Sequence, residues 1–467
     1  MMFYLSSDDT ALNHIRRDSD ETEEMLAGSW RIDVNGWIFA RVLGDPYRLG
    51  FQNGHLLAHE IRHAIEAEKL HVERAYKRDW QFFRETGMSL YWPRIPAEYR
   101  AEIEGITHGV KSEGISDIHL EDIVALNGFE DTVSYHQWLK AREYPSAVPT
   151  VREEHCSAFM ASGKATRDGS ILVAHNTWSS YLIGTCNLII DSSPANGKRF
   201  LMQAHPGTLS SGTDWFVGTS GLLITETTIS GVNTFNPDGT PYFIRARKAV
   251  QYADTIDVWM KIMLQDNNGG YANDWLIGDV KTGEIAWLEL GTFNHAIDRT
   301  FDGVFVGSNV ATSEQVRSET QFNYDDDSGS CTARQKRWGE LIEPSRTRLN
   351  VEMAKGFLAD HYDAFSGRDS PNRNTLCGHV ELDDRGAPEW EMGPYYPAGA
   401  YDGKITDSNL ASKGAFWAHW GKPCGTDFNA GSFLSQHPEY DWQQPRLRDI
   451  KAYPWTLFNA SSKWKIN

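Results

Sequence analysis

A predicted β-hairpin with a cysteine at its start is the feature that most constrains this chain. Cys156 precedes a strand-like run from Ser157 to Ala165, and Ser170 to Ala174 forms the returning run. The intervening Thr166-Arg167-Asp168-Gly169 predicts a tight turn, because Gly adopts positive φ without penalty. The returning run ends on a polar cluster of His175, Asn176 and Thr177. Because antiparallel strands lie side by side, we expect Cys156 to lie beside this cluster.

A cysteine in this position can be structural or catalytic. A cysteine at a strand start is more often a small buried hydrophobe than a nucleophile. A chain cut before Cys156, however, would carry a thiol and an α-amine on one residue. Since an α-amine has a pKa of roughly 8, it can act as a base near neutral pH. Nucleophile and base would then be the same residue, and no separate triad would be required.

The residues around this hairpin resemble those of a known family. Cys156-Ser157-Ala158, the Asp-Gly turn and the run Val173 to Trp178 look like the processing site of phospholipase B-like proteins, which are N-terminal-nucleophile hydrolases. The run is also similar, more loosely, to the isopenicillin-N acyltransferase family. Further blocks resemble phospholipase B-like proteins in the same order: 206–211, 220–222, 227–230, 271–279 and 399–406. The resemblance implies a four-layer αββα sandwich with the nucleophile at the end of a central strand.

The resemblance also implies roles for individual residues. Cys156 would be the nucleophile, and its sulfur would first attack the carbonyl of His155, so that the chain cleaves itself between these two residues. Asn309 matches an Asn that helps to hold the developing oxyanion. Arg334, or less closely Arg337, matches a required Arg, although a solvated basic stripe on a helix would look the same. The remaining candidates are the hairpin residues His175, Asn176 and Thr177, of which the histidine is as compatible with a structural role as with a catalytic one.

Three regions are predicted along the chain. Residues 1–29 form an acidic tail, residues 30–155 a mainly helical segment, and residues 156–467 the catalytic region. Helices combined with antiparallel hairpins, without regular βα alternation, indicate the α+β class. Within the helical segment, Gly50 and Gly54 are expected to permit close helix packing, since no preceding strand or Lys-Ser/Thr pair completes a phosphate loop.

Composition excludes several functional classes. The net charge of -18 argues against nucleic acid or an anionic membrane as the main partner. Since no run of about 18 apolar residues occurs, we expect no stable membrane insertion. The first residues lack the pattern of a signal peptide, and the five cysteines are scattered, so we expect a cytoplasmic protein. No paired-histidine or C-x-x-C motif is present, and we expect no metal and no cofactor.

These observations predict a self-processing N-terminal-cysteine acyl hydrolase. It would cleave an amide or ester bond of a small-molecule acyl substrate through a thioester acyl-enzyme. The cleaved N-terminal segment would stay associated through its apolar helices. Two alternatives remain open at this point: an acyltransferase that passes the acyl group to an amine, and an unprocessed, inactive binding protein.

Overall fold

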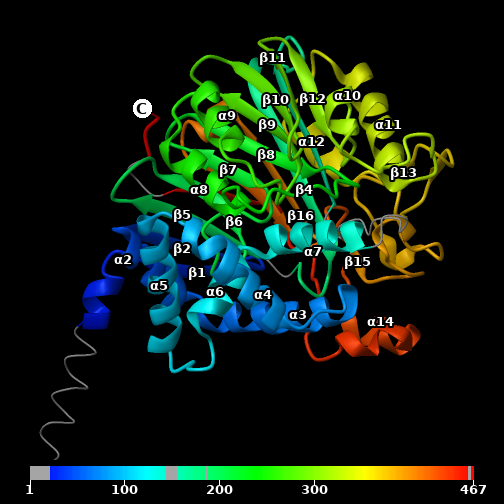
Figure 1. Ribbon diagram of the computed structural model, residues 1–467. Coiled ribbons are helices and arrows are strands. Elements are labelled where there is room, and N and C mark those ends of the chain that lie inside the picture. The colour runs from blue at the N-terminus through cyan, green and yellow to red at the C-terminus, as the bar shows by residue number, and fades with distance from the viewer. Residues whose placement is uncertain (1–20, 144–154, 185–186, 461–463, 467) are drawn as a thin grey trace, which may run out of the picture.

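Two β-sheets packed face to face form the centre of the computed structural model (Figure 1), which describes residues 21–143, 155–184, 187–460 and 464–466. Within these residues, one sheet has nine strands in the spatial order β1 (Trp30–Val34), β2 (Trp37–Gly44), β5 (Leu188–Pro194), β6 (Phe200–Ala204), β7 (Trp215–Gly218), β8 (Leu222–Thr228), β9 (Asn273–Asp279), β10 (Glu284–Leu290) and β11 (His295–Thr300). All neighbours in it are antiparallel except β2 and β5, which are parallel.

The second sheet carries the predicted hairpin. Its described strands are β12 (Gly303–Gly307), β3 (His155–Gly163), β4 (Gly169–Ser180), β16 (Asp402–Asp407), β17 (Ala415–Trp420) and β18 (Thr456–Asn459), in that order, with β15 (Ala398–Ala400) also paired to β4. A separate short pair joins β13 (Tyr362–Asp363) and β14 (Arg368–Asp369). The strand that begins at His155 therefore lies inside the sheet, between two partners.

Helices cover the outer faces of both sheets. The α-helices are α2 (Pro46–Leu56), α3 (Ala58–Ala75), α4 (Trp80–Thr86), α5 (Ala97–Ser112), α6 (Leu120–Asn127), α7 (Phe129–Glu143), α8 (Tyr242–Tyr252), α9 (Ile256–Leu264), α10 (Glu314–Arg317), α11 (Ser330–Ile342), α12 (Val351–Leu358), α13 (Ser408–Ala411) and α14 (Ala430–Gln436). Figure 1 shows α8 and α9 lying over strands of the nine-stranded sheet.

Three apolar clusters define the layers. One joins the nine-stranded sheet to helices of the N-terminal segment and to α8 and α9, for example through Ile103 and Trp275. A second fills the space between the two sheets, where Met160 and Leu276 lie. The third joins the seven-stranded sheet to α11 and α12 through Phe159, Trp338 and other residues. Helix, sheet, sheet and helix thus form successive layers, and the predicted α+β class with a four-layer sandwich is confirmed.

The predicted N-terminal segment shares the nine-stranded sheet with later residues. Its hairpin β1–β2 joins that sheet because β2 pairs in parallel with β5 from Ile38 and Leu188 onward. Of the predicted acidic tail, residues 21–26 are helical, and residues 1–20 lie outside the described residues. The proline-containing stretch from Ala141 to Glu154, whose composition predicts an exposed linker, also falls largely outside them, since residues 144–154 are not described. Within the described chain, no helix combines the length and the apolar character needed to cross a membrane.

Glycines bring the backbones of α2 and α5 into contact. A Cβ added at Gly50 would lie 1.8 Å from the carbonyl oxygen of Glu102, and one at Gly54 would lie 2.1 Å from that of Ile106. From the other side, a Cβ at Gly105 would lie 2.1 Å from the carbonyl oxygen of Tyr47. The prediction that Gly50 and Gly54 serve helix packing is therefore confirmed.

Substitution at this crossing is expected to destabilise the fold. Gly50→Ala inserts a methyl group against backbone that cannot rotate away, so we expect a loss of about 3 kcal/mol of unfolding free energy. Gly339→Ala is the matched control, because an added Cβ on that exposed residue of α11 meets no atom within 4 Å. The control should gain about 0.5–1 kcal/mol from the higher helix propensity of Ala. Urea denaturation measures both, and equal stability of the two variants would contradict this account.

Candidate active site

The β3–β4 hairpin places Cys156 beside the polar cluster at the end of β4. Cys156 pairs with Thr177, and Ala158 pairs with His175. Side chains alternate between the faces of a strand. Ala158 belongs to the apolar cluster between the sheets, so Cys156, two residues before it, also points between the sheets, and its thiol is buried. The predicted proximity of Cys156 to His175, Asn176 and Thr177 is therefore present in the structure.

An aspartate from the other sheet contacts the thiol. Asp214 immediately precedes β7, and its Oδ2 lies 3.6 Å from Cys156 Sγ. One ring nitrogen of His175 and one Asp214 oxygen lie within 4.8 Å of each other and of the sulfur. Asp214 has a φ of 63°, a left-handed conformation that Asp tolerates better than most residues. The turn before β7 thus directs a carboxylate at the cysteine.

Burial dominates the protonation of these three groups. It raises the pKa of the Cys156 thiol well above its usual value, and the negative charges of Asp214 and Glu226 raise it further. Burial also raises the pKa of Asp214 to about 7, although a hydrogen bond with Glu226 and the charge of Lys404 act in the opposite direction. The pKa of His175 is well below its usual value, because it is buried and Lys404 lies nearby. The site therefore holds a protonated thiol, a neutral imidazole and a carboxyl group that titrates near neutrality.

Lys404 connects the hairpin to the Asp214 turn. Its Nζ donates to Thr177 Oγ1 at 2.6 Å and to the carbonyl of Thr213 at 3.0 Å. It also pairs with the Asp402 carboxylate at 3.3 Å. Asp402 in turn accepts from the backbone N–H of Thr177 at 2.8 Å. Thr177 is thus a structural link between β4 and β16, and Lys404 fixes the residue before Asp214.

Arg334 links the backbone of Cys156 to Asn309. From α11, its Nη1 donates to the Cys156 carbonyl at 2.7 Å and to Ser157 Oγ at 3.0 Å, while Nη2 donates to Asn309 Oδ1 at 2.8 Å. The guanidinium carbon also lies 4.6 Å from the centre of the Trp178 ring. Arg337 points elsewhere and pairs with Asp360 at 2.7 Å. The geometry therefore associates Arg334, and not Arg337, with the candidate site.

Asn309 and Asn176 are held by backbone contacts. Asn309 follows β12 with a φ of 70°, and its Nδ2 donates to the carbonyl of Thr228 at 2.7 Å. Asn176 Oδ1 accepts from the backbone N–H of Ser157 at 3.2 Å, and its Nδ2 donates to the carbonyl of Leu376 at 2.8 Å. Both side chains are therefore held in fixed orientations close to Cys156 and Ser157.

Removing the Arg334 guanidinium is expected to destabilise the site and the fold. Arg334→Met leaves the Cys156 carbonyl, Ser157 Oγ and Asn309 Oδ1 without this donor, at a cost of about 1–3 kcal/mol for each buried acceptor. Arg337→Met is the control, because its pair with Asp360 is partly exposed and such pairs contribute about 0–1 kcal/mol. Thermal unfolding compares the two, and an Arg334→Met protein as stable as the control would refute the assignment.

Sequence reasoning missed four charged residues of this site: Asp214, Glu226, Asp402 and Lys404. A signal existed for two of them, because Asp402 and Lys404 stand two positions apart in a strand-like run and so share one face. Charged residues two apart on a buried face indicate a polar site inside a sheet. Asp214 gave no comparable signal, because it reaches Cys156 only through the packing of one sheet on the other.

A small cavity lies next to the Asp214 turn. Its volume is about 40 Å³. The residues that line it include His205, Ser210, Ser211, Gly212 and Tyr242. Burial is the main cause that raises the pKa of the Tyr242 hydroxyl, and the nearby negative charges of Asp214 and Glu226 raise it further. The cavity therefore borders the acidic side of the candidate site.

Comparison with known proteins relates this site to one family. Residues 58–288 match the family model described as Phospholipase B, a span that contains Cys156 and Asp214. Phospholipase B-like protein F of Dictyostelium discoideum is 27% identical over 205 residues, which are 38% of this chain and 36% of that protein. Phospholipase B-like 1 of Homo sapiens is 26% identical over 242 residues, 48% of this chain and 40% of that protein. An uncharacterized protein of Archaeoglobus fulgidus is 26% identical over 265 residues, 53% and 42% of the two chains.

Among solved structures, the chain is similar to a mutant of the conjugated bile acid hydrolase from Clostridium perfringens. The TM-score is 0.31 and the sequence identity is 8%, over 56% of this chain and 88% of that chain. The chain spans less than half the length of the first two curated relatives named above. The family match and these relatives confirm that the chain resembles the phospholipase B-like proteins, as its sequence motifs indicate.

Proposed function

We infer that this chain is a self-processing acyl hydrolase in which Cys156 is the nucleophile. The observation that carries this proposal is the contact of 3.6 Å between the Cys156 thiol and the Asp214 carboxylate. A thiol needs a base to become nucleophilic, and an acceptor with a pKa near 7 is suited to take its proton at neutral pH. The contact lies at the cysteine that the family motif marks, within the matched residues.

Self-cleavage is the first reaction. Asp214 accepts the thiol proton as Cys156 Sγ attacks the carbonyl carbon of His155, the preceding residue of β3. The peptide C–N bond breaks, its nitrogen takes up the proton, and a thioester joins the His155 carbonyl to the sulfur. Water hydrolyses this thioester and leaves a carboxylate on His155 and a free thiol and α-amine on Cys156. No other reactant is required.

Acyl hydrolysis is the second reaction. The sulfur attacks the carbonyl of an amide or ester substrate, the α-amine passes the thiol proton to the leaving group, and water releases the acyl group from the thioester. Asn309 supports the oxyanion with the second N–H of its amide, since only one is used by the Thr228 carbonyl. Such a donor typically contributes about 2.7–4 kcal/mol. Arg334 is a positioning residue, because it contacts the Cys156 carbonyl and not the sulfur.

The two fragments should stay together after cleavage. Residues 30–44 supply β1 and β2 of the nine-stranded sheet, and β2 is hydrogen-bonded along its length to β5 of the second fragment. The apolar cluster on that face also includes residues of both fragments, such as Ile61 and Ile190. We therefore expect fragments 1–155 and 156–467 to elute together in size-exclusion chromatography and to separate only in denaturant. Separation in native buffer would contradict this expectation.

The experiment for the hydrolase activity uses the processed protein. It is incubated with N-acyl amino acids, short-chain nitrophenyl esters and phospholipid micelles, and acyl adducts are sought by mass spectrometry on fragment 156–467. An acyl adduct on Cys156 together with released acid supports the proposal. Released acid without dependence on Cys156, or no reaction with any of the three substrate classes, would count against it. An added amine that intercepts the acyl group would identify an acyltransferase instead.

A further inference from the structure

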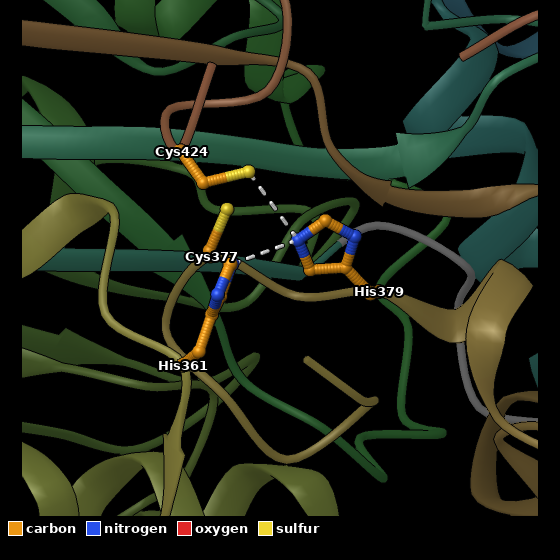
Figure 2. Close-up of side chains that lie close together, drawn as sticks. All are labelled: His361, Cys377, His379 and Cys424. Atoms are coloured by element: carbon orange, nitrogen blue, oxygen red, sulfur yellow. Dashed lines mark hydrogen bonds between the residues drawn. The ribbon is translucent and has the colours of Figure 1, made fainter. Parts of the chain in front are cut away.

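We propose that His361, Cys377, His379 and Cys424 bind a zinc ion. The ion would join three segments of the chain next to the candidate active site. One potential ligand atom from each residue lies within 4.8 Å of all the others. His361 Nε2 lies 3.1 Å from His379 Nε2, and Cys424 Sγ lies 3.7 Å from the same nitrogen. Figure 2 shows the four side chains converging from separate segments of the chain.

The spacing of these atoms fits a tetrahedral ion. Zinc–sulfur bonds of about 2.3 Å and zinc–nitrogen bonds of about 2.0–2.1 Å place neighbouring ligand atoms about 3.3–3.8 Å apart. The separations of 3.1 and 3.7 Å are close to this range. Two thiolates and two imidazoles form a donor set typical of zinc. Since all four positions would be filled by protein atoms, the site would be structural and not catalytic.

The surroundings of His379 orient it as a ligand. Its Nδ1 lies 3.0 Å from Glu381 Oε1, which leaves Nε2 to face the cluster. Glu381 is itself held by the Tyr181 hydroxyl, which donates to Oε2 at 2.9 Å, and by an ion pair with Lys422. A carboxylate on the second nitrogen is the usual support of a metal-bound histidine, because it fixes the tautomer and the ring orientation.

The cluster holds a loop that contacts the candidate active site. The Leu376 carbonyl, next to Cys377, accepts from Asn176 Nδ2 at 2.8 Å and from Trp178 Nε1 at 3.2 Å. At the next position, a Cβ added to Gly378 would lie 1.9 Å from the Trp178 ring, so the loop packs directly against it. A zinc ion at this cluster would therefore fix the loop that orients Asn176 and Trp178.

Local spacing in the sequence indicates no metal site, because these four residues form no short ligand motif. Cys377 and His379 are two residues apart, but the short β13–β14 pair separates them from His361, and Cys424 follows β17. Only the fold brings the four together. The same proximity would also allow a disulfide between Cys377 and Cys424 under oxidising conditions, and the experiment must distinguish the two.

Metal content and thiol protection test the site. Full-length protein purified under reducing conditions should contain about one zinc ion per chain by elemental analysis. Zinc should protect Cys377 and Cys424 from alkylation, and a chelator should expose both thiols. This measurement uses the wild-type protein, so it does not depend on whether variants fold, and it is independent of any hydrolase activity. Reduced protein that takes up no added zinc, or a Cys377–Cys424 disulfide found by peptide mapping, would overturn the proposal.

Matched variants locate the ion. Cys424→Ser and His361→Gln should lose bound zinc, whereas Cys331→Ser and His295→Gln, which alter the same residue types outside the cluster, should retain it. Glu381→Gln should keep the ion but bind it about 10–100-fold more weakly in chelator competition, because it removes only the support of His379. Zinc retained equally by the ligand variants and their controls would place the ion elsewhere and refute the assignment.

Discussion

Cys156→Ala is expected to abolish both self-cleavage and acyl hydrolysis. The variant lacks the only atom proposed to form the thioester, and loss of a nucleophile typically lowers the rate on the order of 10⁴–10⁶-fold. The side chain is small and buried between the sheets, so the Ala variant should fold. Purified protein would run as one uncut chain of 52.8 kDa on a denaturing gel. Substrate turnover would fall to the level of the buffer control.

Two further variants test whether cleavage requires the Cys156 thiol itself or any buried thiol. Cys331→Ala removes another buried cysteine of the described residues and should still yield the two fragments. Cys156→Ser keeps a weaker nucleophile and should cleave slowly. Added hydroxylamine should accelerate cleavage of the wild type by intercepting the thioester at His155. Cleavage of the Cys156→Ala chain at the wild-type rate would exclude the proposed mechanism.

Asp214→Asn is expected to slow self-cleavage by about 10²–10⁴-fold, the usual contribution of a general base. In the wild type, the reaction needs the ionised carboxylate. Because burial raises the pKa of Asp214 to about 7, the cleavage rate should rise with pH through this value and level off above it. The variant should lose this inflection. Rates are measured from freshly refolded precursor between pH 5 and 9, a window of roughly two units on either side of the pKa.

A stability measurement separates loss of catalysis from unfolding. A carboxyl whose pKa is raised by folding binds its proton more tightly in the folded chain, so its contribution to stability decreases as pH rises from about 4 toward 7. Asp214→Asn carries no charge in this site and should therefore not be less stable than the wild type at pH 8.

Asp168→Asn, in the exposed hairpin turn, is the control and should cleave normally. An Asp214→Asn chain with wild-type rate and pH profile would remove Asp214 from the mechanism.

The hairpin that carries Cys156 was predictable because its signals are local. Alternating residues and an Asp-Gly turn indicate β3 and β4, and the observed register places Cys156 opposite Thr177. A similar local signal lies nearby. The alternating pattern from Trp30 to Leu43 favours a single strand, but Asn35-Gly36 forms the turn between β1 and β2, with φ values of 47° and 77°. An Asn-Gly pair between apolar runs is a strong predictor of such a turn.

Helix ends were predicted less well where packing decides them. The pattern from Ser408 to Ala418 favours one helix, but the helix ends at Ala411, and Gly414, with a φ of 63°, precedes β17. The pattern from Pro241 to Gln265 favours a continuous helix, but Ala253 is extended and Thr255 caps a new helix by accepting from the Val258 N–H. Apolar periodicity alone indicates neither interruption.

In the candidate site, too, residues with local sequence signals could be predicted and residues placed by long-range packing could not. Its motif residues could be predicted because they occur in runs that resemble a family. Asp214 and Lys404 could not be assigned roles, because their contacts with Cys156 and Thr213 depend on how two sheets pack. The cluster of two cysteines and two histidines is similar, since His361 and Cys424 lie far in the sequence from Cys377 and His379. Long-range packing, and not local propensity, determines these parts of the molecule.

Intact mass analysis with N-terminal sequencing of the purified wild-type protein, beside Cys156→Ala, tests the central claim most directly. The account predicts a wild-type fragment that begins at Cys156 and a complementary fragment that ends at His155, with a single uncut chain in the variant. A wild type that remains uncut under the same conditions would leave no α-amine on Cys156. That result would contradict the proposed mechanism and favour an unprocessed binding protein.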